Sequence, residues 1–156
     1  MKKTISLVLW VVALQLIGYG MGMITEANLD PWYLSLYKSS LTPPGFVFGI
    51  VWSILYVMLA IVGWQLFQIK QLVRVSPLRI AFIAQLVLNW LWTPLFFHFH
   101  WIGTALICLV AIVLFTTWFL TVSWRHTRLL FWLMLPYWFW VCFASYLNFI
   151  IWHVHP

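Results

Sequence analysis

The sequence predicts an all-α membrane protein, a bundle of five transmembrane helices. Hydrophobic residues make up 65% of the chain and charged residues only 6%. All charged residues lie outside five long apolar runs, each near the ~20 residues that a helix needs to cross the hydrocarbon core. These runs leave too little chain for a second domain, so residues 1–156 should form a single membrane domain. The runs cover residues 5–24, 46–69, 80–97, 101–122 and 129–152.

The distribution of charge predicts the orientation of this bundle. Lys and Arg are retained on the cytoplasmic side of short loops. Seven basic residues fall on one side, whereas Lys38 and both acids, Glu26 and Asp30, fall on the other. We therefore expect a multi-pass protein of a bacterial cell membrane, with its amino terminus in the cytoplasm and its carboxyl terminus outside. Anionic lipid headgroups are a sufficient partner for the basic residues, so no nucleic-acid partner is expected.

The first run and the loop after it carry two local signals. Gly18 and Gly22 are four residues apart, a spacing typical of close helix contact. A secretory signal is the alternative interpretation of this run, but no small-x-small cleavage site follows it. In the loop, residues 25–41, Asp30 before Pro31 predicts the cap and first turn of a short helix. Its aromatic residues suit either an interfacial belt or a lid over a ligand; they are Trp32, Tyr33 and Tyr37.

Pro43 and Pro44 predict the first turn of the second helix. Small and hydrogen-bonding residues then recur at three- and four-residue steps, which places them on one helix face. The glycines of this face suit helix packing, whereas Trp52 and Tyr56 each carry a polar atom that needs a partner. The face should therefore look toward protein or ligand. Its members are Gly45, Gly49, Trp52, Ser53, Tyr56, Ala60 and Gly63.

The last three runs differ in polarity. Gln85 and Asn89 in the third run should face inward, because an unpaired amide is costly in hydrocarbon. The fourth run has Cys108 as its only soft group and is expected to form a lipid-facing wall. In the fifth run, Pro136 should bend the helix. Further inward-facing residues at helical steps are Trp92, Thr93 and Phe96 in the third run, and Tyr137, Trp140, Ala144, Asn148 and Trp152 in the fifth.

Depth places these faces in one region of the bundle. With ~1.5 Å of rise per residue, four of the inward residues lie roughly 10–15 Å below the outer ends of their helices. Trp140 lies deeper, at ~20 Å, where it could form a floor. We expect an aromatic pocket in the outer half, roofed by the Trp32–Tyr33 loop and suited to a flat, mainly apolar ligand. The four residues are Trp52, Asn89, Trp92 and Ala144.

Several motifs together resemble the TspO/MBR family, which comprises bacterial tryptophan-rich sensory proteins and the mitochondrial translocator protein, also called the peripheral-type benzodiazepine receptor. The resemblance covers nearly the whole chain. It departs at Ser39 and Leu41 in the loop, and no basic residue follows Tyr146, so the sterol-recognition pattern expected there is not supported. The motifs are Trp32-Tyr33, Pro43-Pro44-Gly45 with Trp52, Asn89-x-x-Trp92-Thr93-Pro94-x-Phe96-Phe97 and Pro136-Tyr137-x-x-Trp140-x-x-Phe143-Ala144-x-Tyr146-Leu147-Asn148.

The resemblance implies a five-helix bundle, usually homodimeric, that binds porphyrins, haem-pathway intermediates and benzodiazepine-site ligands. It also implies that Trp52 and Trp140 take part in porphyrin photochemistry. No cofactor is required, and a porphyrin or haem would be the ligand. The family's ligand-contacting positions correspond to Tyr33, Pro43, Trp52, Asn89, Trp140 and Ala144.

Composition also narrows the function classes. The five runs contain no ionisable Asp, Glu, Lys, Arg or His, which an ion-coupled transporter would normally need. Glu26 and Asp30 are the chain's only carboxylates, so a hydrolytic site in the bundle is not expected. We predict a membrane receptor or sensor, with tetrapyrrole translocation or light-dependent porphyrin breakdown as the alternatives. The predicted ligand-binding residues are Tyr33, Pro43, Trp52, Tyr56, Asn89, Trp92, Phe96, Trp140, Ala144 and Asn148.

Two His-x-His pairs fall outside the family pattern. His98 and His100 close the third run, and His153 and His155 close the chain. If the two helices end side by side, these imidazoles could supply metal or haem ligands. The alternative is that they are interfacial residues, because the i, i+2 spacing is poor for chelation from one helix face. No other metal site is predicted, since Cys108 and Cys142 fit no metal motif.

Overall fold

The computed structural model describes residues 2–69 and 72–155. Five of its helices are long and apolar enough to cross a membrane, which confirms the predicted all-α bundle of a multi-pass membrane protein. Two short helical turns accompany them. In chain order the elements are α1 (Lys2–Glu26), η1 (Leu29–Tyr33), α2 (Gly45–Gln68), α3 (Leu72–Thr93), η2 (Pro94–His98), α4 (Ile102–His126) and α5 (Arg128–Val154).

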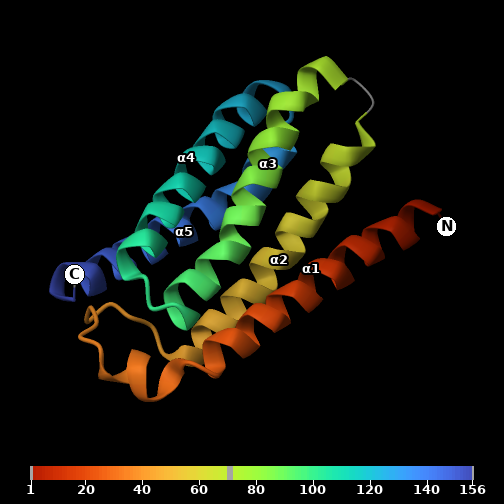
Figure 1. Cartoon of the computed structure of the whole chain (residues 1–156). Helices are drawn as coiled ribbons and strands as arrows, with labels where there is room; N and C mark the ends of the chain where they lie inside the picture. Colours follow the sequence, from red (N-terminus) through yellow and green to blue (C-terminus); the bar gives the residue numbers. More distant parts are fainter. Residues whose placement is uncertain (1, 70–71, 156) are drawn as a thin grey trace.

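The helices run up and down in two groups. α1 packs along α2, while α3, α4 and α5 pack in sequence, and α2 contacts both α3 and α5 more sparsely (Figure 1). The Gln15 side chain ties the first pair, because its amide Nε2 donates to the Ser53 carbonyl at 2.8 Å. The amino terminus lies at one end of the bundle and the carboxyl terminus at the other (Figure 1). Residues 27–44, called the lid below, lie at the carboxyl-terminal end.

α3 begins well before the predicted residue 80, because a charged side chain inside it finds partners on another helix. The Arg79 guanidinium donates to the carbonyl of Leu66 at 3.3 Å and to that of Ile69 at 2.8 Å. These carbonyls belong to the last turn of α2, which has no intrahelical donors left for them. Arg79 therefore caps α2 while it extends α3. Beyond Thr93 the third span continues as the turn η2.

The lid also has different limits from those predicted. α1 continues to Glu26, so the lid begins two residues later than residue 25. α2 begins at Gly45 with Pro44 as its N-cap, so the two prolines precede the helix instead of forming its first turn. Pro44 has an extended backbone with ψ 147°, which is incompatible with a helical turn.

α4 is not only the lipid-facing wall that its composition predicted. One side of it is buried against α3 and α5, and its polar groups are paired there. The Cys108 thiol donates to the Leu88 carbonyl of α3 at 3.3 Å. The Trp138 indole N–H of α5 donates to the Thr117 hydroxyl at 2.8 Å. α4 therefore joins α3 to α5, and only its outer side faces lipid.

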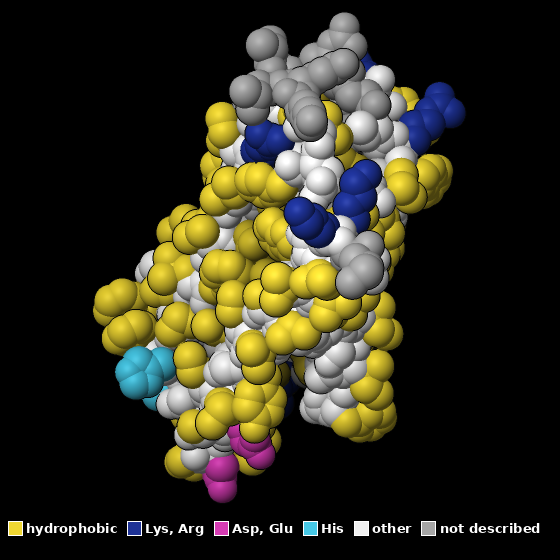
Figure 2. All heavy atoms as spheres, turned by 90° about the vertical axis from the view of Figure 1, so that its right-hand side faces the viewer, with side chains coloured by type: hydrophobic (Ala, Val, Ile, Leu, Met, Phe, Trp, Pro, Cys, Tyr) yellow, Lys and Arg dark blue, Asp and Glu magenta, His cyan; other side chains and the backbone are white. Residues whose placement is uncertain are grey.

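Charge separates along the bundle as predicted. Figure 2 shows Lys and Arg side chains toward one end and the two acidic side chains at the opposite end. We call these the basic end and the lid end, since Glu26 and Asp30 lie at or in the lid. The placement of the basic end in the cytoplasm stays a prediction of the positive-inside rule.

The glycines differ in what surrounds them. A Cβ at Gly18 would lie 2.7 Å from two ring atoms of Tyr56, so a side chain is excluded there. Gly63 is equally tight, with a Cβ position 2.6 Å from the Trp10 ring. At Gly22 and Gly49 nothing lies within 4 Å. Close helix contact is thus confirmed for Gly18 but not for its Gly-x-x-x-Gly partner.

Gly18→Ala is expected to destabilise the protein by about 1–3 kcal/mol, the usual cost of overpacking. The Tyr56 ring cannot easily move away, because its hydroxyl is hydrogen-bonded in the core. Gly49→Ala is the matched control and should be neutral or slightly stabilising. Thermal unfolding of both variants in the same detergent measures the difference. Equal melting temperatures would contradict the close α1–α2 contact.

Candidate ligand-binding site

The lid lies over an aromatic cluster at the end of α3. The Trp32 ring stacks on the His100 imidazole, with centroids 3.9 Å apart and planes 16° apart. Trp32 also meets the edge of Phe96 at 5.5 Å. Tyr33 contacts Phe96 at 6.2 Å and Phe97 at 5.4 Å. The two lid aromatics therefore cover this end of the bundle.

The lid is ordered by its own lysine. The Lys38 ammonium donates to three carbonyls of the preceding turn, those of Tyr33, Leu34 and Leu36, at 2.9, 3.2 and 2.9 Å. It also lies 4.9 Å from the centre of the Tyr33 ring. Burial raises the pKa of the Tyr33 phenol above its ordinary value of 10.0. That phenol stays protonated at neutral pH and remains a hydrogen-bond donor.

The lid is also attached to α5. The backbone N–H of Tyr37 donates to Nε2 of His155 at 3.0 Å. The hydroxyls of Ser39 and Tyr146 lie 3.3 Å apart. These contacts hold the second half of the lid against the carboxyl-terminal part of the last helix.

A buried polar pair lies deeper, between α2 and α3. The Tyr56 hydroxyl donates to Oδ1 of Asn89 at 3.0 Å, and both residues are at least 95% buried. The Asn89 amide, predicted to bind either a ligand or another helix, thus has a partner on α2. The Trp52 ring packs beside this pair, 5.6 Å from Tyr56 and 6.4 Å from Tyr137.

Two other polar groups of the core have no such partner. The Tyr137 hydroxyl is buried without a hydrogen bond. Gln85 is completely buried, and neither atom of its amide is paired. Gln85 lies one helical turn from Asn89 on the same face of α3. It faces inward as predicted, and the bundle centre retains unused hydrogen-bonding capacity.

Trp92 and Asn148 tie three helices together. The Trp92 indole N–H donates to Oδ1 of Asn148 at 3.2 Å, and Nδ2 of Asn148 donates to the Ile102 carbonyl at 3.0 Å. The Trp92 ring stacks on Phe96 with centroids 5.4 Å apart. The polar atoms of these two predicted ligand contacts are therefore already paired, and what they offer to a ligand is aromatic surface.

Trp140 lies in a groove between α2 and α5, with a volume of about 440 Å³. The Trp140 indole N–H is buried without a partner, and its ring meets Phe48 edge-on at 5.6 Å. Ile54 and Phe139, which are 56% and 60% exposed, line the same groove. The groove therefore opens toward the lipid-facing surface. Trp140 was expected as the floor of an enclosed pocket and instead lines this lateral groove.

The predicted site residues thus form three sets, not one enclosed pocket. One lies under the lid, one at the polar pair and one at the groove. Pro43 is half-buried in the extended segment before α2, and Ala144 is half-buried against the core. The sets are Tyr33, Trp92, Phe96 and Asn148 under the lid; Trp52, Tyr56 and Asn89 at the pair; and Trp140 at the groove.

The two histidine pairs do not assemble a metal site. Among residues 2–69 and 72–155, no group of three or more His, Cys, Asp or Glu side chains could hold a metal ion. His100 is stacked on Trp32, His155 accepts from the lid, and His153 stacks on Phe149 at 6.0 Å. Within each pair the i, i+2 spacing sends the rings in different directions. His100 and His155 thus contact the lid, and His153 packs on a neighbouring residue of α5.

A family model shows where this arrangement belongs. The TspO/MBR family model matches residues 9–153, which include every residue of the three sets. The chain belongs to the TspO/MBR family.

Relatives from three kinds of organism agree with this assignment. The chain is 33% identical to protein CrtK of Rhodobacter capsulatus, covering 85% of this chain and 84% of the relative. It is 31% identical to the tryptophan-rich protein TspO of Archaeoglobus fulgidus, covering 94% and 95%. It is 35% identical to the human translocator protein, covering 78% and 73%. The TspO/MBR resemblance inferred from motifs is confirmed.

Sequence reasoning missed some residues of this TspO/MBR site. Phe97 and Phe48 are apolar in an apolar chain, so nothing in the pattern distinguished their inward contacts. The role of His155 in holding the lid had no sequence signal, because its partner is a backbone N–H 118 positions away. Tyr137 was predicted to face inward with Trp140 and Ala144, and it is buried, but it was not among the predicted ligand-binding residues.

Tyr56→Phe should remove the α2–α3 hydrogen bond while keeping the ring that packs against Gly18. Interhelical bonds of this kind contribute ~0.6 kcal/mol on average and up to ~1.7. We expect a loss of stability in that range, because the Asn89 carbonyl oxygen loses its donor. Unfolding in mixed detergent measures it, with Tyr19→Phe, on an exposed tyrosine, as the control. A variant as stable as the control would leave Asn89 with another partner.

Proposed function

We propose that this TspO/MBR protein is a receptor or sensor in a cell membrane, and that it binds a porphyrin or a similar flat tetrapyrrole in the lateral groove between α2 and α5. The observation that carries the proposal is the Trp140 indole N–H. It is buried without a partner in a groove of about 440 Å³. A donor of this kind costs free energy unless a bound molecule accepts from it.

The chemistry around that donor supports a flat and mainly apolar ligand. Phe48 and Phe143 present aromatic surface at 5.6 and 5.8 Å from Trp140, and Pro136 and Val51 line the same groove. Aromatic walls with few polar contacts suit a conjugated ring. A carbonyl or carboxylate on the ligand would accept the indole hydrogen bond.

The Tyr56–Asn89 pair lies deeper in the bundle, between α2 and α3, and Trp52 packs beside it. The unpaired hydroxyl of Tyr137, 6.4 Å from Trp52 between ring centres, adds a donor there. We infer that a ligand seated against Trp140 and reaching Trp52 would use both tryptophans. That arrangement also fits the alternative in which the two indoles quench or transform a photoexcited porphyrin.

Translocation of a tetrapyrrole is the second candidate function, because the relatives include translocator proteins. The two candidates share the same ligand and differ in turnover. A receptor holds its ligand, whereas a carrier releases it on the other side. Uptake of a porphyrin into liposomes that contain the protein, followed by stopped-flow, separates them. Uptake no faster than in protein-free liposomes, with retained binding, favours the receptor.

Protoporphyrin is expected to quench the intrinsic tryptophan fluorescence, through Trp52 and Trp140. In a Trp52→Phe, Trp140→Phe variant, we expect about tenfold weaker binding, which corresponds to ~1.4 kcal/mol for a lost hydrogen bond and stacking surface. Fluorescence titration of the purified protein in neutral detergent measures the affinity.

The matched control is Trp118→Phe, because Trp118 is 40% exposed on α4 and lines neither the lid end nor the groove. It should bind protoporphyrin like the parent protein. Unchanged affinity in the double variant, or an equal loss in the Trp118 control, would sink the proposed site.

A further inference from the structure

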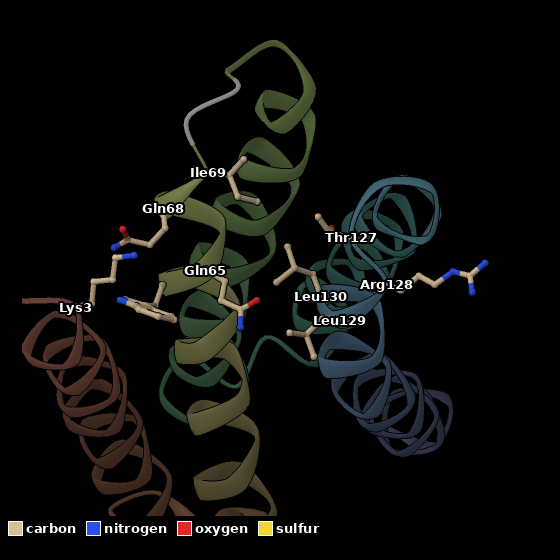
Figure 3. A pocket seen from close by; sticks show the side chains of 9 residues that line it. Lys3, Gln65, Gln68, Ile69, Thr127, Arg128, Leu129 and Leu130 are labelled. Carbon is tan, nitrogen blue, oxygen red and sulfur yellow. The ribbon is translucent and has the colours of Figure 1, made fainter.

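A second cavity, of about 450 Å³, lies at the basic end of the bundle. It is bounded by the first turns of α1 and α5 and the last turns of α2 (Figure 3). Lys3 extends toward Gln68, and Gln65 extends toward Leu130 (Figure 3). Leu129 provides a further apolar wall. This cavity lies at the opposite end of the bundle from the lid, so it is separate from the site described above (Figure 1).

Two groups that can donate hydrogen bonds are left unused around this cavity. The indole N–H of Trp64 and the hydroxyl of Thr127 both line it, and both atoms are buried without a hydrogen-bond partner. Thr127 is the N-cap residue of α5 but makes no capping bond. The first N–H groups of that helix therefore lack a side-chain acceptor, and the positive end of its dipole is not neutralised.

Two backbone carbonyls beside the cavity are already engaged. The last carbonyls of α2, those of Leu66 and Ile69, accept hydrogen bonds from Arg79. Helix ends normally offer both donors and acceptors to a ligand. Here a cation fills two of the carbonyls at the end of α2, and the side-chain amides of Gln65 and Gln68, which line the cavity, offer both donors and acceptors.

Charge in this region is uncompensated. Both acidic residues of the chain, Glu26 and Asp30, lie at the lid end. Arg128 lines the cavity, but its guanidinium points away from it, 5.0 Å from the Trp124 ring centre (Figure 3). Lys3 is the cation that extends along the cavity wall. An anionic partner for Lys3, which would also accept from these donors, must therefore come from outside the chain.

We propose that this cavity binds the phosphate group of an anionic phospholipid from the membrane leaflet at the basic end. The Lys3 ammonium and the Trp64 indole bind the phosphate, and the amino end of α5 adds its positive potential from the other side of the cavity. Leu129, which is 57% exposed, contacts an acyl chain. Free phosphate would use the same donors but would leave this leucine without a partner. The cavity also lies at the ends of membrane-spanning helices, where headgroups reside.

Native mass spectrometry of the full chain in neutral detergent tests this site with two lipids. Dioleoylphosphatidylglycerol should bind more tightly than dioleoylphosphatidylcholine. Lys3→Gln should weaken phosphatidylglycerol binding about fivefold, the effect of ~1 kcal/mol for one cation at a headgroup. Lys2→Gln is the matched control, since it removes the same charge one residue away, outside the cavity lining, and should retain the affinity.

Trp64→Phe provides a second arm that changes no charge. It keeps an aromatic ring and removes the unpartnered donor, so phosphatidylglycerol binding should weaken while phosphatidylcholine binding does not change. Inorganic phosphate added at the lipid's concentration should not displace the lipid. Protoporphyrin binding in the lateral groove should persist in Lys3→Gln, which keeps this test separate from that of the proposed function.

Three outcomes overturn the lipid site. Equal binding of the two lipids would mean that the cavity does not distinguish an anionic headgroup from a zwitterionic one. Equal weakening by Lys2→Gln and Lys3→Gln would mean that the attraction is diffuse. Displacement of phosphatidylglycerol by inorganic phosphate would mean that the cavity takes a soluble anion.

Discussion

The absence of water from the hydrocarbon core is the constraint on which this structure depends. Polar side chains there must pair with each other or remain unsatisfied. The pairs that result connect different helices: Tyr56 with Asn89 joins α2 to α3, and Trp138 with Thr117 joins α5 to α4. Apolar packing alone provides little preference for one helix arrangement over another in lipid. These few directional bonds therefore fix which helix faces meet.

Under the same constraint, each buried polar group that stays unpaired costs free energy. Trp140 at the lateral groove, Gln85 and Tyr137 in the core, and Trp64 at the basic end all keep buried polar atoms without partners. Among the described residues, they occur in the middle of the bundle and at its basic end. A protein under selection only for stability would replace them by apolar residues. Their positions agree with a bundle built to hold molecules other than itself.

The sequence was sufficient for the number of helices, because each apolar run has a membrane's length and charges fall between the runs. It also placed Asn89 and Tyr56 on inward faces, since an amide or a phenol in hydrocarbon has few alternatives. It could not predict that they bond to each other, which depends on how α2 and α3 are rotated. The early start of α3 was missed because the partners of Arg79 are carbonyls of another helix. The buried side of α4 was missed because lipid and protein core select equally apolar residues.

Because the Trp140 groove opens laterally, its occupancy depends on the concentration of the ligand in the bilayer and not on that in the aqueous phase. A molecule that enters between Ile54 and Phe139 comes from the bilayer, whose volume is a small fraction of the sample. A hydrophobic compound is enriched there by its partition coefficient, so modest contacts inside the groove suffice for occupancy at a low aqueous concentration. Ranking such compounds by apparent affinity then reports lipid solubility together with fit. Two ligands with the same contacts would differ in potency if one dissolves better in lipid.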